Sequence, residues 1–168
     1  TLGTGGTTCS KMVDEQCAIE QTFTLGFAIL DGGNLIHDVG FMEDGLTSHY
    51  DALTMVNDIA GYARRIKEGI RFDKDTMDLN VLKEVGHGGE YLTAMSTFTN
   101  CRKEIWYPEL HDRYNNEKWM KEGAKDLRTR IHEKTKAILA EPTPERIPAD
   151  VKAKFAEILE RANARINN

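Results

Sequence analysis

The sequence predicts an α/β fold in which only the first part of the chain alternates helix with strand. A glycine-rich loop, a helix and a short apolar strand follow one another within the first 40 residues, and from about residue 50 onward the apolar spacing is helical. A single strand cannot satisfy its backbone hydrogen-bonding groups without neighbours. We therefore expect further strands upstream of Thr1 to complete the sheet.

Length and composition limit the class of protein. The chain has 168 residues, 40% of them hydrophobic and 29% charged, which is ordinary for one globular domain. Its formal net charge of −5 argues against nucleic-acid binding through phosphate contacts. The best apolar run, Leu25 to Leu30, is too short to span a membrane. Three cysteines without a C-x-x-C pair fit a reducing compartment, so we expect a cytoplasmic protein.

The opening loop, GTGGTTCSK at residues 3–11, leaves several interpretations open. It could cradle a phosphate, hold a small substrate near Ser10 or Lys11, or be an ordinary turn. The P-loop pattern is absent because no second glycine stands beside Lys11, and G-x-G-x-x-G fails at Thr8. Phosphate binding is therefore the least favoured of the three.

A helix and a strand follow this loop. Asp14 is a plausible N-cap, and Cys17–Leu30 is apolar nearly all round, which is typical of a buried helix. The run Asp31–Asn34 is a turn signal. The residues from Leu35 to Val39 then predict a short buried strand that ends among polar residues.

The rest of the chain predicts helices. The first runs from about Tyr50 to Glu68 and ends at Gly69. Its apolar stripe comprises Ala52, Met55, Val56, Ile59, Ala60 and Ala63. A second helix starts at Asp75, and its inward-facing residues are expected to be Met77, Val81, Leu82 and Val85. Three more helices are predicted at 91–102, at 116–140 with a break at Pro142–Pro144, and from an Asp150 cap to about 165.

The end of the predicted strand carries the residues best suited to catalysis or ligand binding. Functional residues gather at the carboxyl ends of strands in α/β folds, and His37 with Asp38 stands there. Such a pair is also a common structural contact, so a catalytic and a structural role both remain open. Glu43 and Asp44 add negative charge and Phe41 adds an aromatic ring, which together suit a cationic ligand.

No metal site and no cysteine nucleophile is predicted. His37 and His49 do not have the i, i+4 spacing of helical metal ligands, and Cys9, Cys17 and Cys101 are scattered. No histidine is placed beside a cysteine by a local signature.

Several segments of the chain resemble the trimethylamine methyltransferase family. They are "SKMVDEQCAIEQ", "GGNLIHDVGFMEDGLTSHYDALTMVNDI", "LNVLKEVGHGGEYLT" and "WYPELHDRYNNEKWMKEGAKDLRTR", which keep their order between about Gly3 and Leu139. The resemblance implies the C-terminal part of a (β/α)8 barrel followed by terminal helices. Residues 1–70 would be the last strand–loop–helix units, with Gly3–Lys11 as the loop after a strand, and residues 71–168 a helical extension.

The resemblance also implies an activity. Members of this family move a methyl group from a tertiary or quaternary amine, such as trimethylamine or glycine betaine, to the cobalt(I) of a cognate corrinoid protein. The enzyme itself would hold no tightly bound cofactor, and we expect a homo-oligomer. The implied substrate-binding residues are His37, Asp38, Phe41 and Glu43, with Ser10 and Lys11 in the opening loop; no catalytic residue is assigned.

Some members of this family carry pyrrolysine, which none of these 168 residues is. Either the protein lacks it, which would favour a betaine-type substrate, or it lies upstream of Thr1. Two other hypotheses stay open, namely a non-catalytic helical interaction domain and a relative with another methyl donor or acceptor, such as a folate. If the protein is an enzyme, we expect the 168 residues alone to be inactive.

Overall fold

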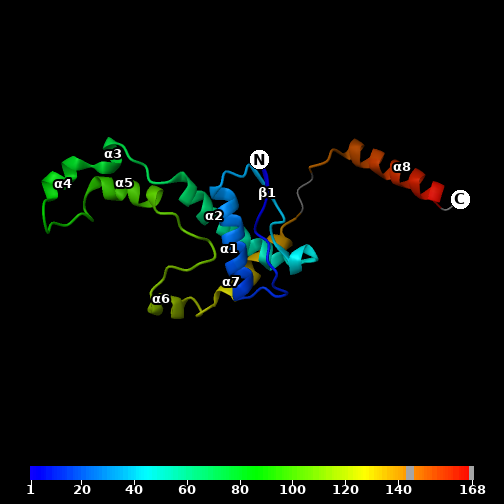
Figure 1. The fold of residues 1–168 in the computed structure, drawn as a ribbon, viewed down its shortest axis with the longest axis horizontal. Helices are drawn as coiled ribbons and strands as arrows, with labels where there is room; N and C mark the ends of the chain where they lie inside the picture. Colours follow the sequence, from blue (N-terminus) through cyan, green and yellow to red (C-terminus); the bar gives the residue numbers. More distant parts are fainter. Residues whose placement is uncertain (143–145, 167–168) are drawn as a thin grey trace. The chain divides into compact units, whose positions relative to one another are not determined.

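The computed structural model describes residues 1–142 and 146–166 (Figure 1). The chain divides into two compact units, Thr1–Lys136 and Ala137–Asn168. The larger unit begins with a strand–helix–strand unit and continues with helices. The predicted division of the chain after residue 70 stays a prediction.

The first two strands form a parallel pair around a helix. Strand β1 (Leu2–Thr4) lies beside β2 (Leu35–His37), and α1 (Glu15–Leu30) connects them. The predicted lone strand is therefore wrong, because β1 is its partner. The predicted strand also stops at His37 rather than at Val39, and it is not buried, since Leu35 is exposed. A parallel pair joined by a helix is an α/β unit, as the sequence predicts.

A second, antiparallel pair follows where the sequence predicts only a loop. Strand β3 (Phe41–Met42) pairs with β4 (Thr47–Ser48), and the short helix η1 (Glu43–Gly45) lies between them. Strands of two residues carry no periodic signal, so only the fold reveals them. The next helix begins shortly after the second strand of this hairpin.

Helix α1 is capped as predicted but is buried on one face only. The Asp14 side chain accepts a hydrogen bond from the Cys17 backbone N–H, which confirms the N-cap. The buried residues of α1 are Cys17, Gln21, Leu25 and Ile29. Phe23 and Phe27 remain 60% and 65% exposed, so the prediction of a helix buried all round is wrong. The described residues cover only the face of α1 that meets the sheet and the next helix.

Helix α2 (Tyr50–Glu68) has the predicted bounds and packs against α1 (Figure 1). Gly69 ends the helix, as expected. Five residues of the predicted stripe are buried, namely Ala52, Met55, Val56, Ile59 and Ala63. Each large apolar side chain buried in this way contributes about 1.5–3 kcal/mol, so the α1–α2 interface is the main core of the unit.

The next three helices bury none of their residues. They are α3 (Lys74–Met77), α4 (Leu79–Val85) and α5 (Met95–Glu104). The single helix predicted from Asp75 is broken at Asp78, whose φ is +41°, and the expected inward burial of its apolar residues is wrong. We call residues 70–104 the α3–α5 segment.

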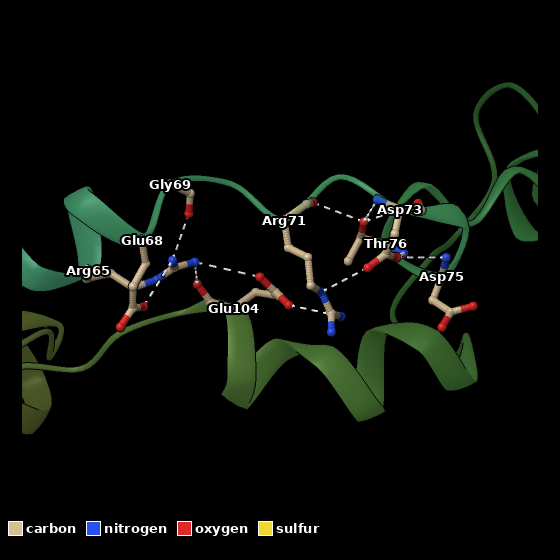
Figure 2. Close-up of polar contacts among 8 residues, drawn as sticks. All are labelled: Arg65, Glu68, Gly69, Arg71, Asp73, Asp75, Thr76 and Glu104. Carbon is tan, nitrogen blue, oxygen red and sulfur yellow. Dashed lines mark hydrogen bonds and ion pairs between the residues drawn. The ribbon is translucent and has the colours of Figure 1, made fainter.

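Charged groups hold the two ends of the α3–α5 segment together (Figure 2). The Arg65 guanidinium donates to the backbone carbonyls of Gly69 and Glu104, both at 2.9 Å. Arg71 pairs with the Glu104 carboxylate at 3.2 Å and with Asp73 at 3.5 Å. The segment thus leaves α2 and ends α5 at one cluster of ion pairs.

The chain then returns to α2. Trp106 packs so closely over Gly61 that a Cβ there would overlap its ring, and Trp106 meets Tyr62 edge to face at 4.3 Å between centroids. Asp58, only 5% exposed, accepts hydrogen bonds from the backbone N–H groups of Glu109 and Leu110 and is 2.9 Å from His111 Nδ1. These contacts anchor the returning segment on α2.

The remaining helices are α6 (Asn116–Lys121), α7 (Leu127–Ala140) and α8 (Ala149–Ile166). One long helix over 116–140 is therefore wrong, because Gly123 and Ala124 adopt positive φ and break it. The last helix lies where it is predicted, although Asp150 is in its first turn rather than at its cap. The predicted break at Pro142–Pro144 falls largely on residues 143–145, outside the described part. No helix in the described ranges is long and apolar enough to cross a membrane.

Candidate functional site

A cavity of about 550 Å³ opens beyond the carboxyl ends of β1 and β2. It lies between the loop after β1 and the loop after β2. Its lining consists of small hydroxyl side chains, acidic groups and one aromatic ring: Thr4, Thr7, Thr8, Cys9, Glu20, Thr24, Asp38, Phe41, Asp44 and Gly45. We call it the mouth cavity.

Backbone hydrogen bonds tie the two loops of the mouth cavity together. The Gly40 N–H donates to the Gly6 carbonyl at 2.8 Å, and the Thr8 N–H donates to the Phe41 carbonyl at 3.0 Å. The Glu43 N–H adds a third bridge, to the Ser10 carbonyl at 3.1 Å. The loops therefore extend the contact between β1 and β2 past the end of the sheet.

Gly5 in the loop and Glu20 on α1 both hold the first loop against the helix. At Gly5, a Cβ would come within 2.9 Å of the Thr24 carbonyl, so only glycine lets the loop approach the helix this closely. The Glu20 carboxylate then accepts hydrogen bonds from Thr8 Oγ1 at 2.6 Å and from the Cys9 N–H at 2.8 Å. These hydrogen bonds, and one from Gln16, lower the pKa of Glu20, so it is ionised at neutral pH.

A thiol–carboxylate contact links the first loop to the second. Cys9 Sγ donates to Asp44 Oδ1 at 2.7 Å. This hydrogen bond and the charge of Asp44 raise the pKa of the Cys9 thiol. Cys9 is therefore a protonated donor at neutral pH rather than a nucleophile.

The second loop has unusual backbone geometry. Asp38, Glu43 and Asp44 adopt φ values of +67°, +50° and +55°. The left-handed region is costly for residues other than glycine, and such residues cluster at functional sites. Three of them within seven residues single out this loop among the described parts of the chain.

Two of the residues predicted to bind substrate line the mouth cavity, and one lies behind it. Asp38 and Phe41 are part of the lining. His37 stands at the end of β2 with Nδ1 2.9 Å from Asp38 Oδ2 and Nε2 3.3 Å from Thr4 Oγ1. The histidine thus contacts two lining residues but does not itself line the mouth cavity.

The other three predicted residues lie outside the lining. Ser10 is buried, and its hydroxyl is 2.9 Å from Asp14 Oδ1, where it helps to start α1. Lys11 donates to the Cys9 carbonyl at 2.9 Å and lines a neighbouring cavity of about 360 Å³. Glu43 contributes its backbone N–H to the bridge between the loops.

Among the ionisable groups of the lining, Cys9 and Glu20 were not predicted to bind substrate. Asp44 was predicted only as negative charge at the end of the strand, together with Glu43. Glu20 is one of several polar residues on α1, and no local pattern distinguishes it. Its role follows from the way in which the loop folds back over the helix.

The electrostatic character of the mouth cavity is acidic. Glu20, Asp38 and Asp44 line it, and the lining that the structure describes contains neither lysine nor arginine. Together with the ring of Phe41, this lining suits a small cation. Across residues 1–142 and 146–166, no group of three or more His, Cys, Asp and Glu side chains is placed to hold a metal ion.

Comparison with known proteins identifies the class to which this α/β chain belongs. A trimethylamine methyltransferase from Desulfitobacterium hafniense (strain DSM 10664 / DCB-2) is 33% identical over 156 residues, 93% of this chain and 31% of that protein. A glycine betaine methyltransferase from strain Y51 of that species is 34% identical over 90% of this chain and 32% of its own length. The chain is therefore similar to about a third of each of these two methyltransferases.

The particular family is equally clear. The family model described as "Trimethylamine methyltransferase (MTTB)" matches residues 2–167, and a trimethylamine methyltransferase from Methanosarcina barkeri (strain Fusaro / DSM 804) is 30% identical over 95% of this chain. The chain belongs to the trimethylamine methyltransferase family, which confirms the resemblance seen in its sequence. It spans about a third of the length of the curated relatives it matches.

Proposed function

We propose that this chain forms part of the substrate-binding mouth of a methyltransferase that moves a methyl group from a methylated amine to the cobalt(I) of a corrinoid protein. The position and lining of the mouth cavity carry the proposal. It opens where parallel strands end, which is where α/β enzymes bind substrates. The names of the relatives support methylated amines as substrates, and they do not favour the alternative of a non-catalytic interaction domain.

We infer that β1 and β2 are two of the last strands of a (β/α)8 barrel. Parallel sheets need both faces covered, and the exposed Leu2 and Leu35 lie in register on the same open face of this pair. The relatives are about three times as long as this chain, which is enough for the remaining strands.

In the proposed reaction the C–N bond breaks and its electron pair stays on nitrogen, while the methyl group passes to the corrinoid, which acts as a co-substrate. The positive charge of the amine disappears in this step. Carboxylates such as Asp38 and Asp44 therefore favour the bound cation more than the transition state, and their contribution is to binding. The rate enhancement would come mainly from holding the methyl group in line with its acceptor.

The charge of the cavity favours one substrate over another. Trimethylamine is a cation when protonated, whereas glycine betaine also carries a carboxylate. Within the described lining, that carboxylate would meet acidic groups and no lysine or arginine. We therefore propose a methylated amine without a carboxylate as the substrate.

The test uses the full gene product with a reduced corrinoid protein. The visible absorbance of the corrinoid reports its methylation with trimethylamine, with glycine betaine, or with neither. Methylation with trimethylamine supports the proposal, and methylation with glycine betaine alone contradicts the substrate preference. If neither amine reacts although the protein is folded and the cobalt reduced, the proposed function is wrong.

A further inference from the structure

Glu20 does more than line the mouth cavity, since it is the point at which α1 holds the loop after β1. Its Oε2 accepts from Thr8 Oγ1 and from the Cys9 N–H, and its Oε1 accepts from Gln16 Nε2 at 2.9 Å. Both carboxylate oxygens are thus engaged by groups of the protein. A carboxylate held in this way is better suited to fixing a loop than to contacting a ligand.

The held loop in turn reaches the opposite loop. The same Cys9 whose N–H binds Glu20 donates its thiol to Asp44 Oδ1. Asp44 lies in the left-handed region at φ +55°, a conformation that needs support from its surroundings. A chain of contacts therefore runs from a rigid helix, through Cys9, to a strained acidic residue that lines the cavity.

We propose that Glu20 is a positioning residue that, through Cys9, orients the Asp44 carboxylate toward a cationic amine in the mouth cavity. This inference rests on the proposed function as far as the amine is concerned. It assigns the ligand contact to Asp44 and the support to Glu20. The loop contacts themselves can be tested without any catalysis.

The first experiment measures the alkylation rate of Cys9 with iodoacetamide as a function of pH in the full gene product, with the label assigned by peptide mapping. The charged groups that face the thiol are Asp44, Glu20 and Lys11. Loss of the Glu20 anchor should release Cys9 from Asp44. In Glu20→Ala, Cys9 is therefore expected to react about threefold to tenfold faster near pH 8, because thiolate formation becomes easier.

The second experiment measures the affinity for tetramethylammonium, a cation that cannot be protonated. Glu20→Ala should weaken its binding severalfold, as should Asp44→Asn. Glu20→Gln keeps an oxygen acceptor for Thr8 and Cys9, so it should restore most of the slow Cys9 alkylation and most of the affinity. Glu15→Gln, a change at an exposed position of the same helix, should alter neither the Cys9 alkylation rate nor the affinity for tetramethylammonium.

Two outcomes would overturn the proposal. One is an unchanged Cys9 alkylation rate in Glu20→Ala. The other is a Glu20→Gln protein that keeps Cys9 protected yet loses as much affinity as Glu20→Ala, which would make Glu20 a direct charge contact. A responsive Cys9 in a protein that methylates no corrinoid with any amine would instead reject the proposed function and leave the role of Glu20 in the loop standing.

Discussion

The helix pair α1–α2 and the α3–α5 segment both carry apolar residues at helical spacing, yet only the pair buries them. Leu25 on α1 is 3% exposed, whereas Phe98 on α5 is 78% exposed. The pair is held by a packed interface and the segment by ion pairs around Arg65. Apolar spacing thus indicates which side of a helix can pack, and the surrounding chain decides whether it does.

The largest expected effect is the difference in the free energy of unfolding between two matched truncations, one in each region. Leu25→Ala removes a buried side chain and should lower the free energy of unfolding by about 2–4 kcal/mol. Phe98→Ala, in the α3–α5 segment, should change it by less than about 0.5 kcal/mol. Denaturant unfolding of the full gene product followed by circular dichroism gives both values. A large loss from Phe98→Ala would mean that another part of the protein covers α5.

The ion pairs at the ends of the α3–α5 segment give the next effect. Arg65→Ala removes two hydrogen bonds to carbonyls and should cost about 1–3 kcal/mol locally. Hydrogen exchange should rise in residues 70–104 and stay unchanged in α1. The exposed neighbour Arg64 provides the control, since Arg64→Ala should leave both regions as they are. Equal exchange in the two variants would show that the segment is held elsewhere.

A smaller effect is expected inside the α1–α2 pair. Gln21 is fully buried, and neither atom of its amide has a hydrogen-bond partner among the described residues. Replacing it by methionine removes an unsatisfied polar group and should raise the free energy of unfolding by about 1 kcal/mol. Thermal unfolding measures the change. A loss of stability would instead indicate a buried water that satisfies the amide.

The smallest expected effect is a loss of stability in acid. It compares the helix N-caps of the two regions. Hydrogen bonds from backbone N–H groups lower the pKa of Asp14 at α1 and of Asp73 at α3 from 3.8. A lowered carboxyl pKa stabilises the fold above the unfolded pKa, and that stability is lost as the pH falls through the folded pKa. Melting temperatures measured downward from about pH 5 should therefore fall.

Asparagine variants check the origin of this fall, because asparagine caps a helix without titrating. Asp14→Asn should keep the melting temperature at neutral pH and flatten part of its fall in acid. Asp73→Asn should change the acid response less, since α3 has only four residues. An acid response that is the same in both variants and the parent protein would assign it to other carboxylates.

The sequence was most informative where the signal is local. The stripe of α2 and Gly69 define that helix correctly because its core lies within 19 residues. Strand β1 is missed because Leu-Gly-Thr has no period, and only its pairing with a strand 33 residues away makes it a strand. Asp38 and Phe41 follow a strand, so the rule on strand ends finds them. Cys9 and Asp44 meet across 35 residues, which no local pattern contains.

The close packing of Trp106 on Gly61 also equips the protein with an optical reporter. Trp106 lies two residues after the end of α5, so its indole should change its fluorescence whenever the chain there lifts away from α2 and admits water. Trp119, the other tryptophan, lies on α6 and donates its indole N–H to the Lys125 carbonyl. With Trp119 changed to phenylalanine, Trp106 is the one tryptophan left in these 168 residues, and the difference in emission between this variant and the same variant with Trp106→Phe would report on that contact.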